Sequence, residues 1–403
     1  MKQQLAEWRR FFPFIVVGFF LAFAFSCFLS YIFPNDVRLE SNLWFGADIR
    51  RVIRDMADPL ANHYRLKVHP LFSLIILPVA MPLVWLAKLI GAGNDLAMEL
   101  ASQFIVSISA GLSWMGIYLL LLSFGIPRLK SFFVSLIFLS SPGFLFWWST
   151  PETFPLGAAT ILVPFLLLAY NTDSQTAWVA TLVGTLSMTA TNLSAGLVAG
   201  YAHFSPRKLF YKLCLISVAA ACVLIIAQKS YLPSAGLPFQ LREEKKYIKV
   251  KIAAIDRFYQ FFIAPVAPLS PPRMSSSQLE FNPWAVDRLL PLRAVVALAW
   301  TILLFIGIRS ALLTHANRLS IALITFLGLQ LLLHTFYGDT PFLYSAHYSP
   351  VMVLLAGFGI ANASKSSYRF LSFLTSVVII VGLPLNILCL LDAFGVGSAY
   401  LAK

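Results

Sequence analysis

Long apolar runs separated by short polar connectors make up most of the chain. The first run, residues 11–33, is about as long as a membrane-spanning helix, and no small-residue cleavage site follows it, which indicates an anchor rather than a removed signal peptide. The further runs lie near residues 70–91, 98–124, 131–149, 154–171, 176–191, 193–204, 208–228, 292–309, 319–334, 348–362 and 369–391. This pattern predicts an all-α polytopic membrane protein that forms a single domain over residues 1–403.

Basic connectors indicate on which side of the membrane each run begins, because Lys and Arg gather on the cytoplasmic side. The connectors here contain Lys2, Arg9, Arg10, Arg128, Lys130, Arg207, Lys208, Lys212, Arg309, Arg318, Lys365 and Arg369. An even number of crossings must then separate the amino terminus from Arg128, although three runs lie between them. Because Pro78 and Pro82 interrupt the run 70–91, we expect it to lie along the outer leaflet.

The resulting topology has about eleven transmembrane helices and two long external segments. The first segment, 34–97, is expected to carry amphipathic juxtamembrane helices, and the second, 229–291, is the main polar insert. Alternation puts Tyr247, Lys249 and Lys251 on one face of the insert, and an amphipathic helical pattern follows. The insert is therefore expected to anchor on lipid headgroups or to cover a site as a lid.

Composition supports the membrane assignment and limits the partners. The chain has 403 residues, of which 59% are hydrophobic and 12% charged, and its formal net charge is +13. Because most of such a chain lies in lipid, its basic residues are expected to meet lipid phosphates and not nucleic acid. The four cysteines lie in apolar runs without metal-ligand spacing, so no metal site is predicted from them.

The densest group of ionisable residues lies between residues 45 and 72, in the first external segment. Helical spacing puts Asp48, Arg51 and Asp55 on one side of a helix. A second set, which shares one face if the chain is extended, consists of His63, Arg65, Lys67 and His69. Four nitrogen donors on one edge suit a phosphate. A solvated helix with ion pairs and a basic strip on lipid headgroups are the alternatives.

Two further polar groups are expected on the same external side. Glu152 follows two tryptophans and Pro151, where a carboxylate is either a partner for a helix N-terminus or a catalytic group. A short external turn near residue 340 carries His334, Tyr337, Asp339, Tyr344, His347 and Tyr348. Hydroxyl and imidazole groups there suit a sugar or a phosphate, although an interfacial aromatic belt explains the tyrosines equally well.

The order of these features resembles that of the GT-C glycosyltransferases, in the branch that contains protein O-mannosyltransferases and the aminoarabinose transferase of lipid A. Asp48, in the sequence FGAD, matches the acidic residue of the family's first external loop. The sequence VHPL at 68–71 matches its histidine-proline motif with one proline missing, and Pro151-Glu152 matches its second acidic position. Asn192 stands where the family often has a lysine, and residues 344–348 fall where related enzymes place late contacts to lipid phosphate or acceptor.

This resemblance implies inverting transfer of a sugar from a polyprenyl-phosphate donor to a lipid, glycan or protein acceptor, on the periplasmic side of a bacterial inner membrane. It implies that Asp48 is the general base and that Glu152 orients the acceptor or holds an optional divalent cation. The implied substrate-binding residues are Arg51, Asp55, Arg65, Lys67, His69, Asn192, Tyr344 and His347. Of these, Arg51, Lys67 and His69 are expected to bind the donor phosphate.

Three other functions are weighed against this one. A lipid-linked oligosaccharide flippase or transporter usually marks its pathway with ionisable residues inside the spans, whereas the apolar runs here are nearly free of charge. A non-catalytic scaffold would leave the matched acidic residues unexplained. A polysaccharide polymerase or ligase that uses a polyprenyl-diphosphate donor stays open within the enzyme class.

Overall fold

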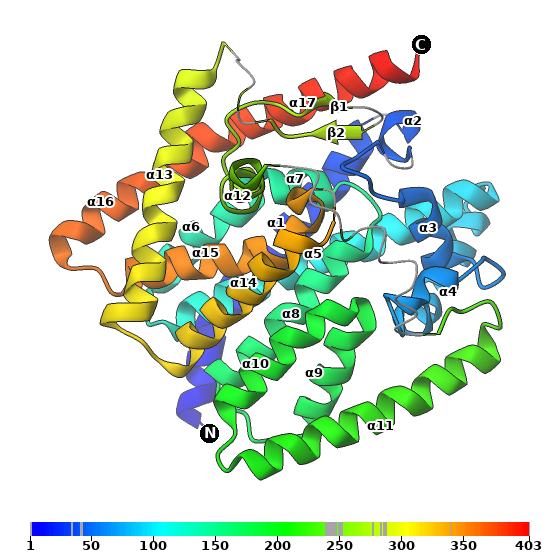
Figure 1. Cartoon of the computed structure of the whole chain (residues 1–403), viewed down its shortest axis with the longest axis horizontal. Helices are drawn as coiled ribbons and strands as arrows, with labels where there is room; N and C mark the ends of the chain where they lie inside the picture. The colour runs from blue at the N-terminus through cyan, green and yellow to red at the C-terminus, as the bar shows by residue number, and fades with distance from the viewer. Residues whose placement is uncertain are drawn as a thin grey trace.

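The computed structural model describes residues 2–33, 35–40, 43–237, 248, 253–275, 278–282, 284, 288–338 and 340–402, and these are mostly helical (Figure 1). The α-helices are α1 (Lys2–Ile32), α2 (Asn35–Arg38), α3 (Ile49–Ala57), α4 (Phe72–Leu89), α5 (Asn94–Ser123), α6 (Arg128–Ser140), α7 (Pro142–Trp147), α8 (Thr153–Ala169), α9 (Gln175–Met188), α10 (Leu193–His203), α11 (Arg207–Tyr231), α12 (Ala254–Phe262), α13 (Leu290–Arg309), α14 (Arg318–Phe336), α15 (Ser345–Ala361), α16 (Lys365–Ser376) and α17 (Gly382–Leu401). Short 3₁₀ turns are η1 (Tyr64–Lys67), η2 (Ala190–Asn192) and η5 (Pro341–Tyr344), and π-helical turns are η4 (Ser310–Thr314) and η6 (Val377–Val381). Strands β1 (Arg273–Ser275) and β2 (Gln278–Glu280) form an antiparallel hairpin in which Met274 lies opposite Leu279.

Long apolar helices identify the chain as an α-helical membrane protein. Eight stretches of the described chain have the length and composition to cross a bilayer, namely Phe11–Ile32, Phe72–Leu89, Asn94–Ser123, Arg207–Tyr231, Leu290–Thr314, Arg318–Phe336, Pro341–Ala361 and Lys365–Leu401. Helices α6, α8, α9 and α10 have only 13, 17, 14 and 11 residues, which is short for a span. The eleven expected spans therefore stay a prediction.

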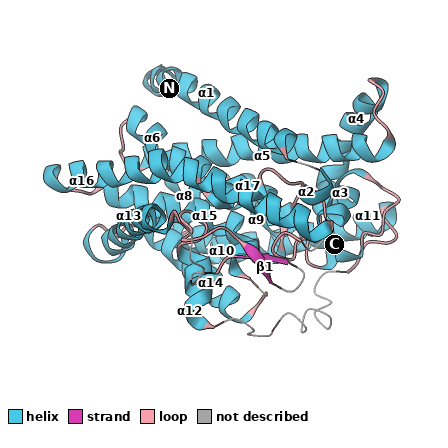
Figure 2. Ribbon diagram, turned by 90° about the horizontal axis from the view of Figure 1, so that it is seen from above, coloured by secondary structure: helices cyan, strands magenta, loops and turns pink. Residues whose placement is uncertain are grey.

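Helix α15 lies at the centre of the bundle. In the most apolar part of Pro341–Ala361, 89% of the residues are buried, against 22% in Phe11–Ile32 and in Arg207–Tyr231. Figure 1 accordingly shows α11 along one edge of the molecule, and Figure 2 shows α1 along one edge with α12 at the opposite one. The outer helices α1 and α11 therefore expose apolar side chains to lipid, whereas α15 packs against protein.

Helix α4 corrects one sequence prediction. Pro78 and Pro82 do not interrupt the run 70–91, because both lie inside the continuous helix Phe72–Leu89. A proline removes one backbone donor, and the neighbouring turns of a helix in an apolar setting keep their hydrogen bonds. The length and composition of α4 are those of a span. Its expected position along the outer leaflet stays a prediction.

Glycines allow α13 and α15 to approach each other closely. A Cβ atom added to Gly307 would overlap the carbonyl oxygen of Leu355, and one added to Gly359 would lie 2.8 Å from the amide nitrogen of Gly307. Close backbone contact of this kind holds helices together in lipid, where the hydrophobic effect does not act between them. The position of α15, which carries His347, therefore depends on this contact.

We predict that Gly307→Ala destabilises the protein by about 1–3 kcal/mol, the usual cost of over-packing a close contact. The melting temperature of the purified protein in detergent measures the effect. Gly328→Ala is the matched control, because a Cβ atom on this α14 glycine meets no described atom within 4 Å. An equal melting temperature for the Gly307→Ala variant and the wild type would contradict the close contact.

Candidate active site

Helix α3 places Arg51 between two carboxylates. The apolar side chains of α3 are buried, as is Asp55, whereas Arg50 and Arg54 are exposed. Arg51 Nε donates to Asp48 Oδ2 at 2.7 Å, and its Nη1 donates to Asp55 Oδ2. The exposed fractions of the Asp48 and Asp55 side chains are 45% and 3%. This geometry confirms the predicted shared face, and the burial of Asp55 excludes a fully solvated helix.

Asp55 is also fastened to the segments that follow it. Its Oδ1 lies 3.2 Å from Nδ1 of the fully buried His63, without hydrogen-bond alignment. Ser73 on α4 donates to the Asp55 carbonyl at 2.8 Å, and its hydroxyl lies 3.2 Å from His63 Nδ1. The other ring nitrogen of His63 lies 3.1 Å from the Asp58 carbonyl. His63 therefore ties α3 to α4 and does not face a phosphate.

The basic residues after His63 do not lie on an extended strand, so that prediction is wrong. Residues Tyr64–Lys67 form the 3₁₀ turn η1, and the amide of Leu66 donates to the His63 carbonyl at 3.1 Å. That carbonyl also accepts a hydrogen bond from the amide of Gly236. Lys67 is buried, and its ammonium group lies 4.5 Å from the centre of the Tyr64 ring. The fold of this turn thus depends on a contact with residues near 236.

His69 is buried against the end of α9. Its Nδ1 lies 2.6 Å from the Met188 carbonyl, so the neutral imidazole donates from Nδ1 and keeps Nε2 as an acceptor. The turn around it is held by backbone hydrogen bonds from Ala190 to Val68 and by Gln228 Nε2, which donates to the Pro70 carbonyl at 2.7 Å. Burial and the nearby charge of Arg51 lower the pKa of His69 to about 3.

Glu152 lies within electrostatic range of the α3 charges. It is the N-cap residue of α8 and accepts a hydrogen bond from the Thr153 amide at 2.6 Å. Burial raises its pKa, against the opposing effects of Arg51 and of the Thr153 hydrogen bonds, and Asp48 raises it further. The expected role as a partner of a helix N-terminus is confirmed. Asp48 and Arg51 are therefore near enough to Glu152 to influence its ionisation.

The remaining candidates lie on the neighbouring helices. His347 on α15 is close enough to His69 to lower its pKa. A Cβ atom on Gly157 would meet both His347 Nε2 and Asn192 Nδ2. The Phe154 ring lies 5.3 Å from the His347 ring and 5.5 Å from the Tyr344 ring, measured between centroids. Arg65 also affects the charge of His69. The candidate residues therefore converge from α3, η1, α8, η2, η5 and α15.

Two buried arginines that were not predicted from the sequence support this site. Arg38 is paired with Glu99 on α5 and donates to the Ser149 carbonyl at 3.2 Å, which holds the loop before Glu152. Arg257 on α12 donates to the carbonyls of His334 and Gly338 at 2.6 and 3.2 Å. Glu99 could have been noticed as a lone carboxylate inside an apolar run, where such residues usually have a partner.

The insert 229–291 is only partly described. Tyr247, Lys249 and Lys251 lie outside the described residues, as does Asp339, so the alternation predicted there is not compared with the structure. The predicted amphipathic helix corresponds to α12, where Phe261 stacks on Tyr348 with ring centroids 4.1 Å apart. Helix α12 is therefore packed against α15, and a lid role for the insert stays a prediction.

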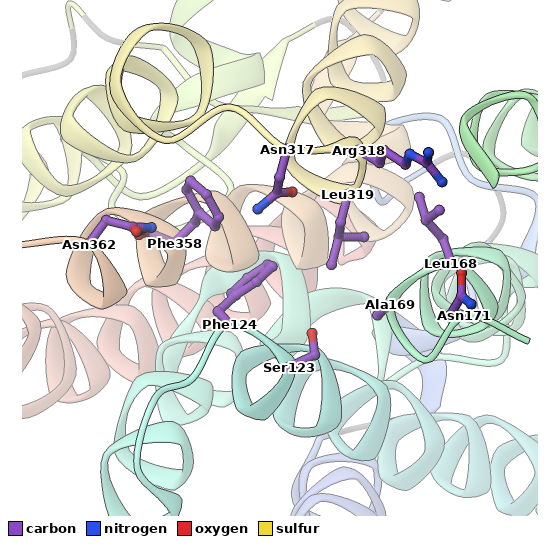
Figure 3. Close-up of a pocket in the computed structure, with 10 residues that line it drawn as sticks. All are labelled: Ser123, Phe124, Leu168, Ala169, Asn171, Asn317, Arg318, Leu319, Phe358 and Asn362. Atoms are coloured by element: carbon purple, nitrogen blue, oxygen red, sulfur yellow. Dashed lines mark hydrogen bonds between the residues drawn. The ribbon is translucent and has the colours of Figure 1, made fainter.

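A pocket of about 410 Å³ lies at the other end of the same helices (Figure 3). Its lining residues are Ser123, Phe124, Leu168, Ala169, Asn171, Asn317, Arg318, Leu319, Phe358 and Asn362. They come from the C-terminal ends of α5, α8 and α15 and the N-terminal end of α14, whereas Glu152 and His347 lie near the N-terminal ends of α8 and α15. The pocket is therefore separate from the candidate site.

The described side chains do not define a metal-binding site. Within the described ranges, no group of three or more His, Cys, Asp or Glu side chains is arranged to hold a metal ion. Glu152 uses one carboxylate oxygen for Thr153, and both Asp48 and Asp55 pair with Arg51. The optional divalent cation stays a prediction without a defined ligand set.

We predict that His69→Asn makes the protein less sensitive to acid. The unfolded chain protonates His69 near its ordinary pKa of 6.5, whereas the folded protein holds it neutral down to about 3. The stability that comes from keeping His69 neutral is therefore fully present above pH 6.5 and is lost as the pH falls from 6.5 towards about 3. Asparagine keeps a donor for Met188 but does not titrate. The fall in melting temperature between neutral pH and about pH 5 should be smaller in the variant than in the wild type. An equal fall in both would contradict a neutral His69 in the folded protein.

Comparison with known proteins assigns no family to these residues. No protein-family model matches the chain, and no curated protein matches it in sequence. The candidate roles of Asp48, Glu152 and their neighbours are therefore argued from geometry and from the resemblance of the motifs.

Proposed function

We propose that the protein is a membrane glycosyltransferase of the GT-C type, which transfers a sugar from a polyprenyl-phosphate donor to a hydroxyl group of a lipid, glycan or protein. The observation that carries this proposal is that Arg51 pairs with Asp48 and Asp55 at α3 while Glu152, from a distant segment at the start of α8, lies within electrostatic range of them. A lipid-linked substrate needs its reactive phosphate at a charged membrane surface and its tail in the apolar layer. The charged residues of this site suit the phosphate, and the apolar lipid-facing helices suit the tail.

Asp48 is the general base in this mechanism. Its carboxylate is partly exposed and is oriented by Arg51 Nε, so an acceptor hydroxyl can reach it. The acceptor proton moves to Asp48 as the acceptor oxygen attacks the anomeric carbon. The bond from that carbon to the phosphate oxygen breaks, its electron pair stays on the phosphate, and the configuration inverts. Placement of the base contributes about 10²–10⁴-fold to the rate.

The other charged residues hold the substrates. Arg65 and Lys67 on η1 supply positive charge for the donor phosphate. Neutral His69 uses its Nδ1 proton for the Met188 carbonyl, so its Nε2 accepts a hydrogen bond from a substrate hydroxyl and does not donate to the phosphate as expected from the sequence. Asp55 fixes the guanidinium of Arg51 from the buried side. Glu152, whose pKa is raised by burial, orients the acceptor hydroxyl.

Basic connectors support an extracytoplasmic site. Arg128, Arg318 and Lys365 begin α6, α14 and α16, at the end of the bundle that holds the pocket of Figure 3. The positive-inside rule assigns this end to the cytoplasm. Glu152 and His347, at the opposite ends of α8 and α15, then face the periplasm of a bacterial inner membrane.

We predict that Asp48→Asn lowers kcat by about 10²–10⁴-fold and leaves donor binding within about twofold, because the amide cannot take the acceptor proton. The assay supplies purified full-length protein with a panel of short-chain polyprenyl-phosphate sugars and candidate acceptors, and it measures release of the polyprenyl phosphate. Asp95→Asn is the matched control, since Asp95 is an exposed carboxylate in the first turn of α5. Equal losses of binding and turnover in Asp48→Asn would assign this residue a structural role.

A further inference from the structure

Buried polar atoms without partners gather beside the charged site. Asn192, His334 and His347 expose at most 2% of their surface. Both side-chain polar atoms of Asn192 and Nε2 of His347 have no hydrogen-bond partner among the described residues, whereas His334 has one with the backbone of Tyr337. Proteins rarely leave buried polar atoms unpaired unless water or a ligand satisfies them. Such a concentration therefore indicates a position where another molecule binds.

Two of these side chains, Asn192 and His347, lie against one turn of α8. A Cβ atom on Gly157 would lie 2.6 Å from His347 Nε2 and 2.7 Å from Asn192 Nδ2. A glycine is thus required for the amide and the imidazole to converge from η2 and α15. A side chain at 157 would occupy the space between these two groups.

Aromatic rings line the same region. Phe154, one turn before Gly157, lies edge-on to the rings of His347 and Tyr344. The His334 ring stacks on the Tyr344 ring with centroids 4.4 Å apart. Flat aromatic faces beside unpartnered neutral donors and acceptors are features that suit a sugar, whose ring has apolar C–H faces and hydroxyl edges.

We propose that Asn192, His334 and His347 bind the hydroxyl groups of an uncharged donor sugar, an inference that rests on the proposed glycosyl transfer. An amide and neutral imidazoles together offer donors and acceptors, and each sugar hydroxyl uses one of each. Asp48, Arg51 and Glu152 serve the phosphate and the acceptor, while this neutral subsite selects the sugar. An amino sugar would bury an unpaired ammonium group here, and a uronate would bury an unpaired carboxylate, so both are disfavoured.

Equilibrium binding to the full-length protein in detergent tests this subsite. The probes are a short-chain polyprenyl phosphate alone and the same lipid carrying glucose, mannose, galactose or an amino sugar. We expect at least one neutral hexosyl form to bind the wild type about tenfold or more tightly than the bare phosphate, because a site built to hydrogen-bond hydroxyls rejects a ligand that lacks them. The amino-sugar form should bind no more tightly than the bare phosphate.

Two variants separate the subsite from the phosphate site. Asn192→Leu removes the amide, and Gly157→Ala fills the space without removing any polar group. Each variant should bind the sugar-carrying lipid no more tightly than the bare phosphate, and its affinity for the bare phosphate should equal that of the wild type. Gly184→Ala on α9 is the matched control, because a Cβ atom there meets no described atom within 4 Å, and it should keep the full gain.

The outcomes distinguish failure of the subsite from failure of the proposed function. If the bare phosphate binds the wild type and no neutral sugar improves its affinity, the subsite is wrong and ordered water satisfies these atoms. Tighter binding of the amino-sugar form than of the neutral forms would also contradict the subsite. So would a Gly157→Ala variant that keeps the wild-type gain in affinity from the neutral sugar. If neither the bare phosphate nor any sugar form binds the wild type, the donor class of the proposed function is wrong.

Discussion

The structure depends on the partly buried guanidinium of Arg51, which pairs with Asp48 and Asp55 and lies within electrostatic range of Glu152, a residue from a distant segment. Burial alone lowers the pKa of Arg51, but Asp55, Asp48 and Glu152 together raise it above its ordinary value. Charges taken out of water are costly unless each has partners. The first external segment must therefore dock where Glu152 begins α8, and this docking fixes the distance between the two candidate catalytic acids.

The lipid phase determines which interactions hold the helices of the bundle together. Apolar helices gain little from contacting each other in lipid, so close glycine contacts and buried hydrogen bonds hold them in place. Gly307 and Gly359 supply such a contact for α15, and the Arg38–Glu99 pair holds the loop before α8. The proposed chemistry thus uses a rigid apolar frame whose polar groups converge at its membrane surface.

Part of this arrangement could be predicted from the sequence. Hydropathy predicted the helical membrane fold, and helical spacing predicted the shared face of Asp48, Arg51 and Asp55, because both follow from local periodicity. The turn Tyr64–Lys67 could not be predicted, since its shape depends on hydrogen bonds to residues near 236. The pairing of Arg38 with Glu99 likewise depends on a tertiary contact. The electrostatic proximity of Glu152 to Arg51 depends on the packing of α3 against α5 and of α5 against α8.

A double-mutant cycle between Arg51→Met and Glu152→Gln tests the shared site most directly, with free energies of unfolding measured in detergent for the wild type, both single variants and the double variant. Residues of one buried charge network couple, so the two effects should depart from additivity by about 0.5–3 kcal/mol. Additivity within about 0.3–0.5 kcal/mol, as for independent positions, would show that the first external segment and the start of α8 do not form one site.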